Sequence, residues 1–350
     1  MDESVEVVCE RHGAAGVITL NRPKALNALT LTMVREMRRA LDAWAADPAV
    51  SRIVVEGAGE KAFCAGGDIR RLTDLGRAGQ KAEGLAFWRE EYQLNAFIKR
   101  YPKPYISFVD GIVMGGGVGV SLHGSHRVAG ERYLFAMPEV GIGFFPDVGG
   151  TYALPRLPGQ TGMYLALTGE RVKRADAKML GLATHAIDSK DFGALRQALV
   201  DGEPVENALM RVSVDPGAAP LADQRAVIDA CFSAGSVSAI LQRLDEAAEK
   251  GSDFAARTAA GMRTKSPTSM CIAFEQVRRG AEMDFEEAMR TEFRIVSRIF
   301  DGHDFYEGVR AVLVDKDNQP RWQPASLEEV DPAAIDRHFA SLGERDLEIA

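Results

Sequence analysis

The stretch from Tyr105 to Gly150 constrains this chain more than any other. It reads YISFVDGIVMGGGVGVSLHGSHRVAGERYLFAMPEVGIGFFPDVGG. An apolar run ends in the turn pair Asp110-Gly111, and three glycines, Gly115 to Gly117, then precede small residues that suit only a buried segment. Successive glycines between a strand and a helix let the backbone approach another group closely. An amide N–H at such a helix start can bind a carbonyl oxygen as half of an oxyanion hole, although a tight packing turn would use the same residues.

Two carboxylates, Glu139 and Asp147, lie in the apolar, glycine-rich end of this stretch. Burying a carboxylate is costly, so such residues usually have a function. A second glycine loop, Phe63 to Asp68, also follows a strand-like run and precedes a helix-like one. Two loops of this kind favour a pair of oxyanion donors, the amides of Gly67 and Gly116.

These loops resemble a known family. Ala65-Gly66-Gly67-Asp68, Met114-Gly115-Gly116-Gly117 and Pro138-Glu139 together are similar to the crotonase (enoyl-CoA hydratase/isomerase) superfamily. The resemblance runs from about Val17 to Val330. Longer strings resemble its 3-hydroxyisobutyryl-CoA hydrolase branch: FCAGGDIR, EEYQLN, KPYISFVDGIVMGGGVGVS, FAMPEVGIGFFPDVGGTYALPRLPG and GHDFYEGVRAVLVDKDNQPRW.

The resemblance implies an α/β fold, a crotonase-like ββα spiral core with an all-helical C-terminal region. It implies hydrolysis of a short 3-hydroxyacyl-CoA, 3-hydroxyisobutyryl-CoA above all, as in valine catabolism. Glu139 and Asp147 would be catalytic, with Gly67 and Gly116 as oxyanion donors. Glu91, the second Glu of the EEY motif, would hold the substrate's hydroxyl. Coenzyme A would be part of the substrate, with no other cofactor and no metal.

The resemblance also places coenzyme A against the loop from Lys24 to Ala28 and against Ala65 and Ile69, with Lys24 and Arg70 as phosphate partners, and it makes Gly116 part of the substrate site. Hydratases of the superfamily use two Glu residues to add water. The position of the first is Gly119 here, which argues against ordinary hydration. Glu139 would act on the thioester carbon as a general base on water or as a nucleophile through an anhydride, and the sequence leaves both open.

Alternative functions are an enoyl-CoA isomerase or hydratase of the same superfamily and a non-catalytic acyl-CoA or RNA-binding module. The formal net charge of −8 disfavours nucleic acid. No P-loop, GxSxG, HExxH or GxGxxG string occurs. Cys64 has no activating His nearby in sequence, and His123 with His126 lacks further ligands at helical spacing, so we interpret all three as structural.

No apolar run approaches transmembrane length, and the four cysteines lack CxxC spacing. The acidic start, MDESVEVVCE, has no signal or transit character, so we expect a cytoplasmic protein, although a matrix protein without its presequence would look similar. The expected partner is the acyl-CoA substrate, with no membrane and a possible homo-oligomer.

Strand–helix–strand alternation near the N-terminus predicts the α/β class. We expect a hairpin of Val5–Val8 and Gly16–Leu20, then a helix capped by Thr30 or Thr32 that runs to about Ala45.

Two charged or Pro- and Gly-rich segments are predicted to lack regular structure. Arg70 to Gly84 is interpreted as a mobile connection, and Asp201 to Ala222 as a linker. We therefore predict an α/β core with the acyl-CoA site in residues 1–200 and a helical C-terminal region, residues 201–350, that packs on it.

Overall fold

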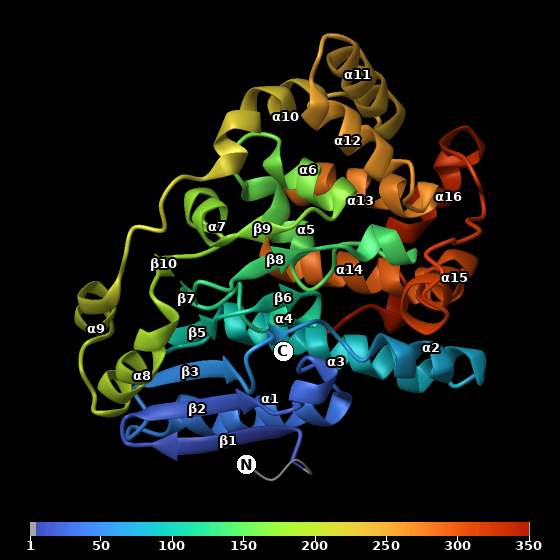
Figure 1. Cartoon of the computed structure of the whole chain (residues 1–350). Helices are drawn as coiled ribbons and strands as arrows, with labels where there is room; N and C mark the ends of the chain where they lie inside the picture. The colour runs from blue at the N-terminus through green and yellow to red at the C-terminus, as the bar shows by residue number, and fades with distance from the viewer. Residues whose placement is uncertain (1–4, 350) are drawn as a thin grey trace. The chain divides into compact units, whose positions relative to one another are not determined.

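The computed structural model describes residues 5–349 and contains two β-sheets (Figure 1). Within these residues, the strand orders are β1-β2-β3-β5-β7-β10 in a six-stranded sheet and β4-β6-β8-β9 in a four-stranded sheet. The strands are β1 (Val7–His12), β2 (Ala15–Leu20), β3 (Arg52–Gly57), β4 (Ala62–Cys64), β5 (Tyr105–Val109), β6 (Ile112–Met114), β7 (His126–Ala129), β8 (Leu134–Ala136), β9 (Val172–Lys173) and β10 (His185–Ala186).

Helices occupy most of the remaining chain, and after β10 the described residues hold helices and loops. The α-helices are α1 (Leu31–Ala46), α2 (Ile69–Arg77), α3 (Lys81–Lys99), α4 (Gly116–Gly119), α5 (Gly150–Ala153), α6 (Thr161–Thr168), α7 (Arg174–Leu180), α8 (Phe192–Val200), α9 (Val205–Val212), α10 (Arg225–Phe232), α11 (Val237–Glu249), α12 (Asp253–Met262), α13 (Pro267–Gly280), α14 (Phe285–Ile299), α15 (His303–Val309) and α16 (Pro332–Phe339). Short helices are η1 (Pro23–Ala25), η2 (Glu139–Ile142), η3 (Leu154–Arg156), η4 (Ser189–Asp191), η5 (Pro220–Gln224), the π-helix η6 (Arg310–Val314), η7 (Leu327–Glu329) and η8 (Gly343–Arg345). The predicted α/β class with a helical C-terminal region is confirmed.

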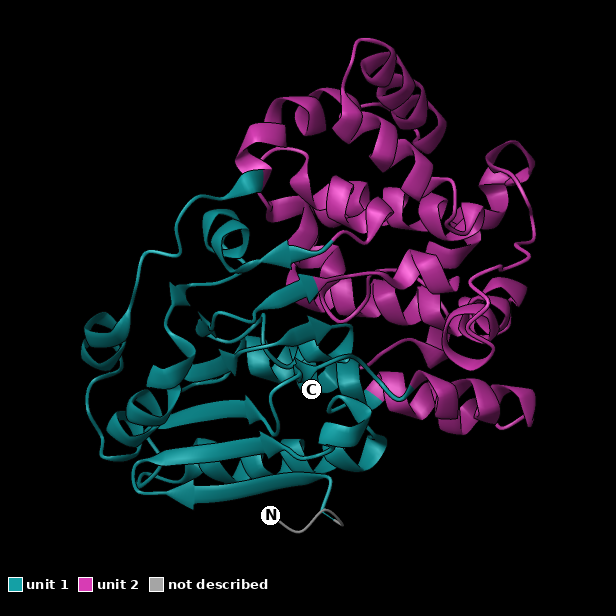
Figure 2. Ribbon diagram, viewed as in Figure 1, with its two compact units in different colours: residues 1–68, 90–135, 171–220 teal, residues 69–89, 136–170, 221–350 magenta. Residues whose placement is uncertain are grey.

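The chain divides into two compact units that interleave along the sequence (Figure 2). Unit 1 consists of residues 1–68, 90–135 and 171–220, of which the structure describes those from residue 5 on. Unit 2 consists of residues 69–89, 136–170 and 221–350, described up to residue 349. Each unit therefore combines segments far apart in sequence, whereas the sequence predicted one border near residue 200.

Unit 1 contains the predicted hairpin, although β1 begins at Val7 rather than Val5. β1 pairs antiparallel with β2 in a register that places Val7 opposite Leu20. β2, β3, β5, β7 and β10 then run parallel. Parallel strands are buried on both faces, and β2 and β3 are accordingly rich in Val and Ile. Thr30, one of the two predicted caps, begins α1, because its side chain accepts a hydrogen bond from the Met33 amide at 3.2 Å.

One face of this sheet is covered by α8 and α9, whose leucines join a buried cluster with sheet residues such as Val17 and Ile106. The prediction of a linker over Asp201–Ala222 is therefore wrong for its first half. Ala208 and Leu209 of α9 are fully buried, so tertiary packing stabilises a helix in a segment whose Pro and Gly content suggested a loop.

Unit 2 is built from helices around an aromatic cluster. Trp88 stacks on Phe144 with ring centroids 5.8 Å apart, and it meets Phe300 edge-on at 5.0 Å. Gly76 of α2 lies against Tyr306, where an added side chain would clash with the phenol. The prediction of a mobile connection over Arg70–Gly84 is wrong, because α2 packs here on a partner far along the sequence.

Candidate active site

The Gly67 loop of unit 1 is held as an extended segment beside Leu29. The Leu29 amide donates to the Gly66 carbonyl at 2.8 Å, and the Asp68 amide donates to the Leu29 carbonyl at 2.9 Å. Because successive amides of an extended segment point to opposite sides, the N–H of Gly67 points away from Leu29. Gly66 has φ of +121°, a conformation that favours glycine.

Gly116 lies directly against this loop. A β-carbon added to Gly116 would be 3.4 Å from the amide nitrogen of Gly67, 3.0 Å from Cδ1 of Leu29 and 2.5 Å from Oε1 of Glu91. Gly116 is the first residue of α4, as the glycine run predicted. The structure thus brings together three residues that the sequence proposed for one site: Gly67, Gly116 and Glu91.

Glu91 is 2% exposed although it lies in a helix of mixed polarity, α3. Helical periodicity alone would place it on a solvated face, and the structure shows that it faces inward. Its carboxylate lies over the glycine of a backbone turn, where a bulkier residue would displace it. Such a group can accept a hydrogen bond from a ligand's hydroxyl.

The predicted coenzyme A loop is also part of unit 1. The Ala65 amide donates to the Leu26 carbonyl at 3.0 Å, so Ala65 and the loop from Lys24 to Ala28 are adjacent. Asn27 is fully buried and donates to the carbonyls of Ala58 and Ala62, which fixes the loop. Lys24 is exposed in η1. The assignment of this loop to coenzyme A stays a prediction.

Two further predicted binding residues belong to unit 2. Ile69, half-buried, begins α2. Arg70 donates a hydrogen bond to the Leu313 carbonyl, so its guanidinium already has a partner within this unit. Both residues stay predicted contacts of coenzyme A.

Glu139 of unit 2 is a buried carboxyl at the start of η2, 6% exposed. Burial, and secondarily the charge of Asp147, raises its pKa well above the ordinary value. Its Oε2 is buried and has no hydrogen-bond partner among residues 5–349. The turn after it is anchored, because Phe144 packs on Trp88 and on Phe305.

Asp147, 5% exposed, is followed by two residues in the left-handed region, Val148 at φ +49° and Gly149 at φ +94°. The sequence reasoning missed a third carboxyl here: Glu292 of α14 accepts hydrogen bonds from the amides of Gly149 and Thr151, both at 2.9 Å. Burial and the charge of Asp147 raise the pKa of Glu292 to about 8. The feature of the sequence that could have indicated Glu292 is a carboxylate on the apolar face of a helix.

Cys64, considered above as a nucleophile, and His126, considered as a metal ligand, have structural surroundings instead. Burial raises the pKa of the Cys64 thiol to about 12, so it stays protonated near neutral pH and is a poor nucleophile. His126 hydrogen-bonds the Ser125 hydroxyl and Glu206. Within the described part of the chain, no group of three or more His, Cys, Asp and Glu residues is placed to hold a metal ion.

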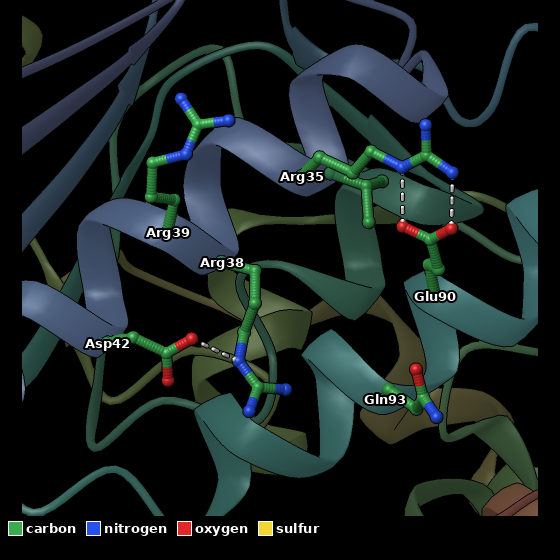
Figure 3. Close-up of a pocket in the computed structure, with 7 residues that line it drawn as sticks. Arg35, Arg38, Arg39, Asp42, Glu90 and Gln93 are labelled. Carbon is green, nitrogen blue, oxygen red and sulfur yellow. Dashed lines mark hydrogen bonds and ion pairs between the residues drawn. The ribbon is translucent and has the colours of Figure 1, made fainter.

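A surface pocket of about 290 Å³ lies between α1 and α3 in unit 1 (Figure 3). Its charges are already paired: Arg35 binds Glu90 through two hydrogen bonds, and Arg38 binds Asp42 at 2.9 Å. Gly67 and Gly116 do not line it. Paired, exposed side chains contribute little binding energy, so we do not assign the reaction to this pocket.

Residues 15–339 match the family described as enoyl-CoA hydratase/isomerase. The chain is 48% identical to the mitochondrial 3-hydroxyisobutyryl-CoA hydrolase of Danio rerio, an alignment that covers 98% of this chain and 92% of that protein. It is 44% identical to the mitochondrial 3-hydroxyisobutyryl-CoA hydrolase of Homo sapiens, with 99% and 91% covered.

Solved structures share the fold over the same length. A carnitinyl-CoA dehydratase from Mycobacterium thermoresistibile has a TM-score of 0.93 and 42% identity, with 98% of each chain covered. An enoyl-CoA hydratase from Rhodobacter sphaeroides has a TM-score of 0.90 and 39% identity, with 98% of this chain and 100% of that chain covered. The names of these relatives point to acyl-CoA chemistry of two kinds, thioester hydrolysis and water addition or removal.

Proposed function

Because this chain belongs to the enoyl-CoA hydratase/isomerase family, we propose that it hydrolyses 3-hydroxyisobutyryl-CoA to 3-hydroxyisobutyrate and free coenzyme A. The identity of 44–48% over nearly the whole chain to hydrolases of that name supports the substrate. The closely similar 3-hydroxypropionyl-CoA is the next substrate we expect. In this proposal coenzyme A enters as part of the substrate.

The observation that carries the chemistry is the environment of Glu139. Its carboxyl is buried, its pKa is raised, and Oε2 has no hydrogen-bond partner among the described residues. A carboxylate of raised pKa is a stronger base than an ordinary one, and a free oxygen can reach water or a carbonyl carbon. A second carboxyl, Asp147, acts on it electrostatically.

In the proposed reaction the thioester oxygen accepts hydrogen bonds from the amides of Gly67 and Gly116, which stabilise the negative charge of the tetrahedral intermediate. Water attacks the thioester carbon and gives a proton to Glu139. The carbon–sulfur bond then breaks, and Glu139 gives that proton to the departing thiolate of coenzyme A. Glu91 hydrogen-bonds the 3-hydroxyl group of the acyl chain, and Asp147 orients the attacking water.

The same residues allow a covalent route. Glu139 would attack the carbon itself, release coenzyme A and form an anhydride, which water then hydrolyses. Acid quenching during a single turnover, followed by mass measurement of the peptide that carries Glu139, separates the routes. An acyl adduct on that peptide indicates the covalent route, and its absence under rapid quenching indicates general-base catalysis by Glu139.

A second candidate function is hydration or dehydration, which the names of the two solved structures favour. In the superfamily resemblance described above, hydration requires a second Glu at the position of Gly119. Gly119 lies within α4, directly after the glycine run. A glycine supplies no proton donor, so we place this function behind thioester hydrolysis.

One substrate panel tests both functions. Purified protein is mixed with the coenzyme A thioesters of 3-hydroxyisobutyrate, 3-hydroxypropionate, isobutyrate, crotonate and carnitine. Free thiol reports hydrolysis, and ultraviolet absorbance of the conjugated thioester reports hydration or dehydration. We expect thiol release from the two 3-hydroxyacyl thioesters first. Efficient interconversion of crotonyl-CoA without thiol release would overturn the proposal in favour of the second candidate.

The cellular location and assembly are part of this proposal. We propose a cytoplasmic enzyme, whereas the curated relatives are named mitochondrial. Within residues 5–349, every helix is too short or too polar to cross a membrane. Cell fractionation tests the location, and sedimentation of the purified protein tests whether it forms a homo-oligomer.

A further inference from the structure

Glu292 is a buried carboxyl that the proposed reaction does not use directly. It lies on α14, is 0% exposed, and is held by a loop rather than by a cation. Its Oε2 accepts from the Gly149 amide and its Oε1 from the Thr151 amide, each at 2.9 Å. The Thr151 hydroxyl also hydrogen-bonds it. Both carboxyl oxygens are therefore committed to the segment that directly follows Asp147.

A second buried side chain holds the other side of the same loop. Gln276 of α13 donates to the carbonyl of Pro146 and, at 2.7 Å, to the hydroxyl of Thr151. Asp147 thus lies inside a loop that is fixed just before it by Gln276 and just after it by Glu292. Both side chains are fully buried, so the bonds form where water does not compete.

The loop needs such support because its backbone is strained. Val148 has φ of +49°, a region that a β-branched residue rarely adopts. Strained residues persist only where surrounding contacts over-determine their conformation. The two hydrogen bonds to Glu292 supply contacts of this kind on the residues that follow Val148.

Electrostatics link the three carboxyls of this region. The charge of Asp147 raises the pKa of both Glu139 and Glu292, and the charge of Glu292 contributes to the raised pKa of Glu139. The groups that act on Glu292 are Asp147 from the loop and the polar groups of Gly149 and Thr151, while the neighbouring α13 presents the neutral Gln276. Glu292 is therefore coupled to the two predicted catalytic carboxyls.

We propose that Glu292 is a positioning residue: through its hydrogen bonds to the amides of Gly149 and Thr151 it fixes the loop that carries Asp147. A purely structural cap of the short α5 would need only a small polar side chain at the loop itself. A fully buried carboxyl brought from a distant helix carries a desolvation cost that such a cap avoids. This inference rests on the proposed function, in which Asp147 and Glu139 act on the thioester.

The main test compares three single variants with the wild-type enzyme on 3-hydroxyisobutyryl-CoA. Glu292→Gln keeps the size of the side chain but presents an amide N–H to one of the two loop amides. Gln276→Met removes the other support without changing a charge. Glu286→Gln removes a charge from the half-exposed side of the same helix, where Glu286 pairs with Arg290, and is the matched control.

We expect Glu292→Gln to lower kcat by roughly ten- to a hundredfold, the scale of a small misplacement of a catalytic group, and to leave KM within twofold. The acidic limb of its pH–rate profile should not move, because a carboxyl whose pKa is about 8 is protonated at lower pH and has no charge to lose there. Gln276→Met should lower kcat without moving that limb. Glu286→Gln should behave as the wild type.

Wild-type kcat in Glu292→Gln, or a raised KM with unchanged kcat, would overturn the inference while leaving thioester hydrolysis intact. A wild-type enzyme that releases no thiol from any 3-hydroxyacyl-CoA would instead overturn the proposed function. Amide hydrogen exchange of the wild-type protein tests the loop without any variant. Strong protection of the Gly149 and Thr151 amides is expected, and exchange at the rate of unprotected amides contradicts the inference even if the variants do not fold.

Discussion

Oε1 of Glu91 lies 2.5 Å from the point that a β-carbon on Gly116 would occupy. Real side chains do not approach this closely, so the carboxylate of Glu91 and the backbone turn at Gly116 are fitted to each other only while residue 116 is glycine. This relationship connects a helix predicted to hold a hydroxyl group with a loop predicted to hold a thioester oxygen.

Gly116→Ala should therefore lower kcat/KM for 3-hydroxyisobutyryl-CoA by roughly a hundredfold, the effect of losing one oxyanion donor. The added methyl group would push Glu91 aside and would also crowd Leu29. Thiol release measures the effect. Gly261→Ala on α12 is the control, because apart from its chain neighbours and its own helix backbone no atom lies within 4 Å of the added methyl group. Equal activity of the two variants would refute the role of this turn.

Glu91→Ala should raise KM for 3-hydroxyisobutyryl-CoA more than for isobutyryl-CoA, which lacks the hydroxyl group. A site that hydrogen-bonds a hydroxyl discriminates only when that hydroxyl is present. The preceding residue provides a matched control, because Glu90 pairs with Arg35 at the surface (Figure 3). Glu90→Ala should change neither KM. The same rise on both substrates would mean that Glu91 only supports α3.

Glu139→Gln should abolish thiol release and leave coenzyme A binding, measured by calorimetry, nearly unchanged. In the wild type kcat/KM should rise with pH through the raised pKa of Glu139, because the base must be ionised. Asp147→Asn should lower kcat and shift this rise to lower pH, since the charge of Asp147 helps to keep the pKa of Glu139 high. A shift in the opposite direction would contradict the coupling.

Wild-type enzyme should hydrate crotonyl-CoA at a rate near background, because Gly119 supplies no second carboxyl. Gly119→Glu should lower thioester hydrolysis, since its side chain occupies space beside Gly116 one helical turn away. Loss of crotonyl-CoA absorbance is the measurement for both proteins. Rapid hydration by the wild type would show that another residue replaces the missing Glu.

Stability should depend on pH through Glu292. Its pKa rises from 4.5 to about 8 on folding, so the folded state binds the proton more tightly than the unfolded chain. This contribution is complete below about pH 4.5 and is lost as pH rises to about 8. The free energy of unfolding, measured with urea at pH 5 and pH 8, should fall less in Glu292→Gln than in the wild type. The difference should be on the order of a few kcal/mol.

The sequence predicted the features that depend on neighbouring residues. The hairpin of β1 and β2, the Thr30 cap and the helix start at Gly116 all follow from short-range patterns, and the structure confirms them. The family and fold class also followed from motifs that lie close together in the chain. Local patterns were sufficient because the contacts that define these features join residues close in sequence, as in the pairing of β1 with β2 and the bond between Thr30 and Met33.

Features that depend on distant partners were missed. α2 is charged and contains a glycine, and the positions of Tyr306 and Phe300 explain why Gly76 is needed. Glu292 was missed because a single carboxylate within the apolar face of α14 only interrupts the apolar pattern of that helix. Its partners, the amides of Gly149 and Thr151, lie far away in the sequence. α9 carried a helical apolar period, and the Pro- and Gly-rich surroundings concealed it.

The interleaving of the two units has a consequence for protein synthesis. Arg77 of α2 donates a hydrogen bond to the Tyr306 carbonyl, 229 positions later in the chain. At roughly 5–20 residues per second, a ribosome makes Tyr306 about eleven to forty-six seconds after it makes Arg77. Until then the apolar side of α2, including the buried Leu72, is without the residues that cover it in unit 2. The nascent chain should therefore bind chaperones that recognise apolar segments, and it should release them late in translation.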